Sequence, residues 1–194
     1  MGSGRSGLPP DFKRSIDMAK KIGSPAQERA RAAFKAGIAY LVPLKDLVEK
    51  GYAEKAKRKK SFASALALGH LLRTAIHIVD GEPQVDPSKV LLSTGTVADV
   101  QVDHIHRYPD RIEVTHCWFP AAYSAADDYL TLCAYQVEKG YAFLNELTWR
   151  RREGKVILPL RKEFQDDGLH LYLMVAERTG QKYSRSQYLG YSTA

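Results

Sequence analysis

The 194-residue sequence is poor in cysteine, with Cys117 and Cys133 the two in the chain. Two cysteines cannot form the framework of several disulfides that holds small secreted domains together. A single bridge between two strands stays open as a pairing, although two buried thiols fit the sparse count better. The core must therefore be stabilised by packing, for which a chain of this length with 44% hydrophobic residues is sufficient.

A long hydrophobic run is also absent from the sequence. The longest apolar stretch lies within 62–72, contains His70 and is followed by Arg73, which leaves it well short of the roughly 18 residues that a membrane span needs. The first residues lack the apolar core of a secretory signal. We therefore expect no transmembrane helix. We expect a chain that is cytoplasmic as synthesised, or that reaches a virion or an extracellular assembly without a signal peptide.

No complete catalytic constellation stands in the sequence. Ser192 follows Gly190 and Tyr191 but lacks the G-x-S-x-G pattern of a nucleophile elbow. Cys117 and His116 resemble a nucleophile and its base, yet adjacent residues of a strand point to opposite faces. The sequence therefore predicts a protein that is not an enzyme and carries no cofactor.

Positive charge is concentrated in the first part of the chain. Through Asp80 there are 16 Lys and Arg against 7 Asp and Glu, a net +9, whereas the remainder holds 13 against 15, a net −2. These two values agree with the net charge of +7 for the whole chain. Segregated charge of this kind indicates a module or face that meets an acidic partner or another subunit.

Helical signals dominate 24–82. Ser24, Pro25 and Gln27 match an N-cap, a first helical residue and a capping box. Apolar residues then recur at helical spacing, and Pro43 should kink or split this helix because it lacks a backbone donor. A second apolar stripe over 62–76 ends before Asp80. We expect a basic, antiparallel helical hairpin over 24–82, preceded by a flexible or partner-bound arm over 1–23.

The pattern changes to the period of a β-strand after Pro87. β-branched and aromatic residues become frequent between turn signals, which predicts a β domain over 83–194. The expected strands are 89–94, 97–106, 111–118, 129–137, 143–150, 155–160, 170–177 and 187–193. This spacing favours an antiparallel β-sandwich of the fibronectin or immunoglobulin type. The predicted fold class is therefore α+β, a helical hairpin followed by that sandwich.

Three histidines near one predicted hairpin are weak candidates for a metal site. His104 and His106 share a face of their strand because side chains alternate. His116 on the next strand falls on the other face if His106 opposes Arg111, and joins the histidine face if His116 opposes Val102. A polar outward face without metal is the simpler interpretation.

Two basic runs are the predicted contacts with a polyanion or a partner protein. The first consists of Lys55, Lys57, Arg58, Lys59 and Lys60, and the second of Arg150, Arg151 and Arg152 beside Trp149. Cations next to an aromatic residue suit phosphate contacts with stacking. No recognised nucleic-acid-binding signature accompanies them. We therefore expect a structural or interaction protein that self-associates or packs into a larger assembly, such as a phage particle, a filament or a surface layer. Binding of nucleic acid through the helical hairpin is the alternative.

Three short segments resemble a family of uncharacterised Bacteroidota proteins, a domain of unknown function. They are SPAQ at 24–27 with the helical residues up to 34, PSKVLLSTG at 87–95, and YLG at 188–190. The resemblance implies a helical segment, an SKVxxSxG strand and a β-rich C-terminal half. It extends from about Ser24 to the end of the chain, while 1–23 is shorter than the corresponding family stretch. The resemblance implies no catalytic residues.

Overall fold

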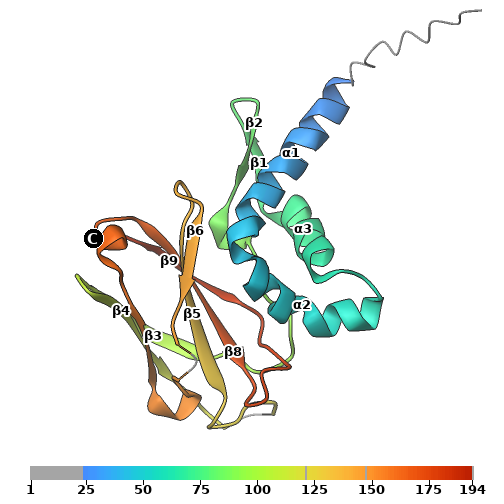
Figure 1. Ribbon diagram of the computed structural model, residues 1–194. Helices are drawn as coiled ribbons and strands as arrows, with labels where there is room; N and C mark the ends of the chain where they lie inside the picture. The colour runs from blue at the N-terminus through green and yellow to red at the C-terminus, as the bar shows by residue number, and fades with distance from the viewer. Residues whose placement is uncertain (1–23, 121, 147, 194) are drawn as a thin grey trace, which may run out of the picture.

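The computed structural model describes residues 24–120, 122–146 and 148–193, and the predicted arm over 1–23 lies outside them. Helices come first in the chain and antiparallel sheets follow (Figure 1). The α+β class is therefore confirmed. Within the described residues, no helix is both long enough and apolar enough to cross a membrane.

The first helix begins where the capping signals predict. Helix α1 (Pro25–Leu41) follows Ser24, whose hydroxyl accepts a hydrogen bond from the backbone N–H of Gln27 at 3.3 Å. The side chain of Gln27 accepts in return from the backbone N–H of Ser24 at 3.1 Å. This reciprocal capping box satisfies two donors that have no partner within the helix.

The predicted two-helix hairpin is not confirmed, because its first arm is one long helical stretch with a bend. A 3-10 turn, η1 (Val42–Leu44), contains Pro43 and joins α1 to α2 (Lys45–Lys59) without a loop. Proline cannot donate to the α-helical ladder, which explains the change of hydrogen bonding at this place. Helix α3 (Ala63–Thr74) packs against both α1 and α2.

A small β-hairpin follows α3 where the sequence predicted the end of a helix. Strands β1 (Ile76–Val79) and β2 (Glu82–Val85) pair in antiparallel fashion. Asp80 and Gly81 connect them, with φ of 52° and 84°. Two consecutive residues with positive φ are typical of the type I′ turn that Asp-Gly favours in hairpins. Residues 89–94, predicted as a strand, instead start at the last residue of the 3-10 turn η2 (Pro87–Lys89) and form one isolated bridge, from Thr94 to Arg185.

The other seven predicted strands overlap strands of the structure, and they form two antiparallel sheets. One sheet has the order β3-β4-β7, and the other has the order β6-β5-β8-β9. The strands are β3 (Gln101–Tyr108), β4 (Arg111–Cys117), β5 (Tyr129–Gln136), β6 (Tyr141–Leu144), β7 (Lys155–Pro159), β8 (Leu169–Ala176) and β9 (Gln187–Ser192). Two further 3-10 turns are η3 (Arg151–Glu153) and η4 (Lys162–Phe164). This topology does not establish a fibronectin or immunoglobulin arrangement.

The four-stranded sheet is covered on both faces. Cys133 and Tyr135 of β5 belong to the core shared with the helices, while Leu132 and Ala134 of the same strand belong to a core shared with β4 and β7. Alternate residues of one strand thus face two different layers. Burial on both faces explains why β5 and β8 read as nearly continuous hydrophobic runs. Cys133 is buried and Cys117 is exposed, and both are free thiols.

Two buried tyrosines connect the helices to the sheet. The Tyr172 hydroxyl donates to the carbonyl of Pro87 at 2.8 Å, so its 2.7 Å contact with Tyr40 is one in which Tyr40 donates. The ring of Tyr40 also meets the ring of Tyr135 edge-on, with centroids 4.9 Å apart. Burial raises the pKa of both hydroxyls of this pair well above the ordinary tyrosine value. Both therefore stay protonated and able to donate.

Candidate functional site

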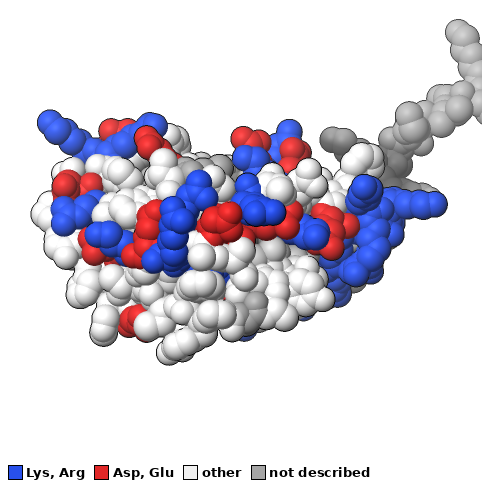
Figure 2. Space-filling model, turned by 90° about the horizontal axis from the view of Figure 1, so that it is seen from below, with Lys and Arg blue, Asp and Glu red and all other residues white. Residues whose placement is uncertain are grey.

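The first basic run lies at the C-terminal end of α2. Its last four members, Lys57, Arg58, Lys59 and Lys60, are exposed, whereas Lys55 is half-buried with its ammonium 5.7 Å from the ring of Tyr52. Figure 2, which views the molecule from below, shows Lys and Arg gathered at the right edge of the molecule, where α2 ends. Cations at a helix C-terminus also interact favourably with the helix dipole. The run thus contributes to helix stability as well as to surface charge.

The second basic run is divided by the fold. Arg151 is 1% exposed and forms an ion pair with the buried Asp128 at 3.2 Å. Its guanidinium also donates to the carbonyls of Ala98 and Asp99 at 2.6 and 2.8 Å. Burial lowers the pKa of Arg151, and the charge of Asp128 opposes that shift. Arg151 is therefore occupied inside the protein, and we exclude it from the predicted contact residues.

The neighbours of Arg151 remain closer to the surface. Arg152 is exposed, while Arg150 is half-buried with its guanidinium 4.7 Å from the ring centre of Tyr129. Arg150 also donates to the Tyr129 hydroxyl at 3.0 Å. A sequence run of three arginines therefore presents one exposed cation, one stacked cation and one buried cation.

The three histidines do not converge. His116 does pair with Val102, as one of the two registers predicted, but a bulge at Asp103 places Val102 and His104 on opposite sides of β3. His104 and His106 are exposed, with ring centroids 5.9 Å apart, and His116 is buried. Among the residues that the structure describes, no three His, Cys, Asp or Glu side chains are placed to hold a metal ion.

His116 is an unusual buried group. Neither of its ring nitrogens has a hydrogen-bond partner in the described structure. Burial, together with the charge of Arg151, lowers the pKa of His116 against smaller opposing effects of Cys117 and Asp103. The imidazole is therefore held neutral inside the protein at neutral pH.

Helix α1 carries apolar side chains over a wider arc than its neighbours cover. Its inward side presents Gly37, Tyr40 and Leu41, all buried. Phe34 and Ile38, one turn apart, are 49% and 42% exposed, and the series continues at Val42 with 63%. The spacing of four residues places these three on one side of the helical stretch.

Phe62, just before α3, extends this surface and is 81% exposed. We call Phe34, Ile38, Val42 and Phe62 the apolar helical face. Two shallow depressions of about 610 and 360 Å³ share Ile38, one over α1 and the other between α1, α2 and α3. Surface hydrophobic residues that occur singly are ordinary, but a contiguous group marks an interaction site. Phe34 and Ile38 belong to the apolar residues whose helical spacing predicted this helix, but that spacing does not tell which of them the fold covers.

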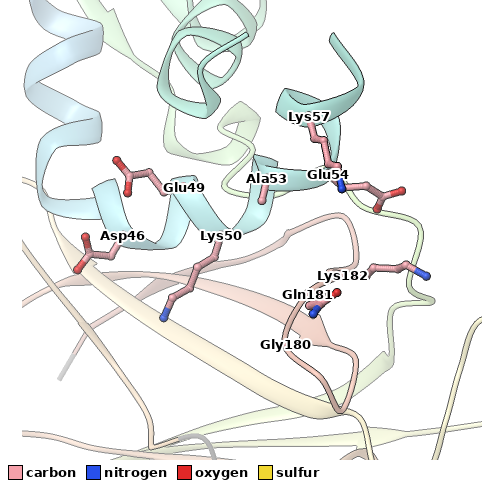
Figure 3. Close-up of a pocket in the computed structure, with 9 residues that line it drawn as sticks. All are labelled: Asp46, Glu49, Lys50, Ala53, Glu54, Lys57, Gly180, Gln181 and Lys182. Carbon is pink, nitrogen blue, oxygen red and sulfur yellow. The ribbon is translucent and has the colours of Figure 1, made fainter. Parts of the chain in front are cut away.

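A larger cleft of about 640 Å³ separates α2 from the turn after β8. Figure 3 shows its side chains of both signs, with Lys50 and Glu54 on α2 and Lys182 on the turn, splayed in different directions. Catalysis by acid and base needs titratable groups that converge on one point. This cleft therefore offers no evident chemistry.

Residues 14–190 match DUF6266, a family of unknown function, and the chain belongs to that family. This confirms the resemblance to an uncharacterised family; the match does not identify a Bacteroidota origin. No curated protein and no solved structure matches the chain.

Proposed function

We propose that this protein is a non-enzymatic interaction protein that docks onto a larger protein assembly through the apolar helical face. The observation that carries the proposal is the exposure of Phe34, Ile38, Val42 and Phe62 over adjoining depressions. Large apolar side chains on a helix are ordinarily covered by the fold. Covering them with a partner removes that area from water, at roughly 25 cal/mol per Å².

The position of α1 supports the same proposal. Residues 24–31 are exposed on all sides, and the N-terminal part of the helix projects from the body of the molecule (Figure 1). Short helices are marginal in water without tertiary packing. A partner seated along this side of α1 would supply packing that the described fold leaves out.

Charge indicates the chemistry of the partner. Residues 24–75 hold 11 Lys and Arg against 4 Asp and Glu, so this segment carries a net +7. Arg31, Lys35 and Lys45 line the depressions of the apolar helical face. We therefore assign as occupant a protein segment with apolar side chains flanked by acidic residues. A second copy of this chain would bring the same cations together, which is unfavourable.

The two larger sheets serve in this proposal as a rigid, sandwich-like support. Ile112 and Val156 of the three-stranded sheet share one core with Leu132 and Leu173 of the four-stranded sheet. Sheets packed face to face around such a core are the architecture of fibronectin and immunoglobulin domains. A phage particle, a filament or a surface layer would be a suitable setting for a module of this kind.

The test uses a designed peptide that carries the chemistry assigned to the partner. An amphipathic helical peptide with Leu at i, i+3, i+4 and i+7 and Glu between is compared by fluorescence anisotropy with a scrambled peptide of the same composition. We expect the patterned peptide to bind at least about tenfold more tightly. Ile38→Ser should abolish that difference, whereas Ile78→Ser, an exposed apolar residue on β1, should preserve it.

Other occupants give different results in the same experiment. Equal binding of the two peptides, or binding indifferent to Ile38→Ser, would contradict the proposal. A dimer seen by size-exclusion chromatography with light scattering, and lost in Ile38→Ser, would make a second copy the occupant. A shift with short mixed-sequence DNA that disappears as salt rises would favour nucleic-acid binding through Lys57–Lys60 instead.

A further inference from the structure

A smaller, cationic cleft lies between α2, α3 and the segment before β9. It has a volume of about 320 Å³, many times the roughly 30 Å³ share of one water molecule. Its lining consists of Lys55, His70, Leu91, Thr94, Gly95 and Arg185. No carboxylate belongs to that lining, although three basic side chains do.

Distant parts of the chain bring these basic groups together. Lys55 belongs to α2 and His70 to α3, and an isolated β-bridge holds the backbone of Thr94 against that of Arg185. Burial lowers the pKa of His70, and the positive charges of Lys55, Arg185 and Arg73 lower it further. The groups are therefore close enough to repel one another.

The cations have no counter-ion among the described residues. In the part of the chain that the structure describes, Lys55, Arg73 and Arg185 form no ion pair with Asp or Glu. His70 Nδ1–H donates to the Thr74 hydroxyl, which itself donates to the His70 carbonyl, and the His70 Nε2 has no partner among the described residues. A group of cations in a cleft concentrates anions when no carboxylate neutralises it.

Thr94 supplies an independent observation. Its hydroxyl oxygen is buried and has no hydrogen-bond partner among the described residues. Its backbone N–H is occupied, because it donates to the carbonyl of Gly51 at 3.1 Å. A buried hydroxyl without a protein partner still has a hydrogen to donate. Thr94 lines the cationic cleft, so rotation about its χ1 would turn this hydroxyl toward an anion there.

From these residues we propose that the cleft binds the phosphoryl dianion of inorganic phosphate or of a small phosphate monoester. Lys55 and Arg185 carry permanent charges that match a dianion, and arginine suits phosphate oxygens through its planar donors. The Thr94 hydroxyl supplies a further donor. A carboxylate monoanion would neutralise one of the two permanent charges. The site is separate from the apolar helical face and does not depend on the docking proposal.

Calorimetric titration of the full chain at pH 7 and constant ionic strength tests the site. The probes are inorganic phosphate, phosphoserine as a monoester, and acetate as a monoanion. We expect saturable binding of one equivalent of phosphate, with acetate at least about tenfold weaker. Binding of phosphoserine as well identifies a monoester site, and binding of inorganic phosphate alone identifies a site for the free ion. Absence of saturable phosphate binding up to about 10 mM would overturn the proposal.

Variants distinguish a specific site from general attraction of anions. Arg185→Gln should weaken phosphate binding about tenfold or more. Thr94→Val preserves shape and removes the hydroxyl, and we expect it to weaken binding about fivefold. Arg29→Gln is the matched control, since it removes one exposed cation of α1 that lines no part of this cleft. Equal weakening by Arg29→Gln and Arg185→Gln would overturn the proposal. Circular dichroism of each variant shows that it is folded.

Discussion

Replacing Tyr172 by Phe should loosen the helices from the four-stranded sheet. The Tyr172 hydroxyl donates to the carbonyl of Pro87 and accepts from Tyr40, and it is buried. Tyr172→Phe removes both hydrogen bonds and leaves the Tyr40 hydroxyl without a partner. Each hydrogen bond contributes about 1 kcal/mol, and an unsatisfied buried group costs about 1–3 kcal/mol. We expect the free energy of unfolding to fall by about 2–4 kcal/mol.

A double-mutant cycle separates the hydrogen bond from the packing of the ring. Tyr40→Phe removes one hydrogen bond and should cost about 1 kcal/mol. In the double variant the Tyr40 hydroxyl is absent, so the total loss should be smaller than the sum of the single losses by about 1 kcal/mol. Tyr191→Phe is the control, because Tyr191 is exposed, and it should change stability by less than about 0.5 kcal/mol.

Urea denaturation followed by circular dichroism measures these differences by linear extrapolation. The hydroxyl pair would not anchor the helices if Tyr172→Phe destabilised the protein no more than Tyr191→Phe. Strict additivity of the two single losses would show that the 2.7 Å contact between the hydroxyls carries no energy. A transition that splits into two steps in Tyr172→Phe would indicate that the helices unfold separately.

Two other predictions concern buried polar groups. Arg151→Met leaves the Asp128 carboxylate buried without its cation, so thermal unfolding should show that the free energy of unfolding falls by about 3–5 kcal/mol. Arg152→Met at the exposed neighbour is the control and should change it by less than about 0.5 kcal/mol. Similar losses in the two variants would contradict the ion-pair interpretation. The lowered pKa of His116 means that the unfolded chain binds its proton more readily, so unfolding free energy should be unaffected above about pH 6.5 and fall below it. His116→Leu should reduce that fall and, by removing two unpaired nitrogens, raise stability at pH 7 by about 1–3 kcal/mol; an unchanged pH dependence in urea titrations would refute this.

Local chemistry predicted the start and the bend of the helical part. Ser24 and Gln27 form the capping box that their spacing indicates, and the change to 3-10 geometry occurs at Pro43. Both signals act within a few residues, so the sequence alone contains their cause. The Asp80-Gly81 turn is equally local, but the predicted end of a helix accounts for only part of its signal. The β1-β2 hairpin was therefore missed although its strongest signal was present.

Longer-range features could not be predicted in this way. The bulge at Asp103 changes which side chains of β3 share a face with His116, and no residue type announces it. The sequence grouped Arg151 with two other arginines as a predicted contact, but Arg151 forms an ion pair with Asp128, which lies more than twenty positions earlier in the chain. The cationic cleft combines Lys55, from the first predicted basic run, with His70 and Arg185. Their proximity to Lys55 depends on the tertiary packing and not on the local sequence.

The distribution of uncovered surface favours the helices over the sheets as the place of function. Strands β5 and β8 are buried on both faces, so the centre of the sheet structure has no apolar surface left for a partner. Helix α1 is different, because Tyr40 and Leu41 on its inward side are buried whereas Phe34 and Ile38 remain exposed. The exposed part of these two residues, 49% for Phe34 and 42% for Ile38, adds no burial to this fold. The proposed partner would cover this remaining apolar area beside the concentrated positive charge.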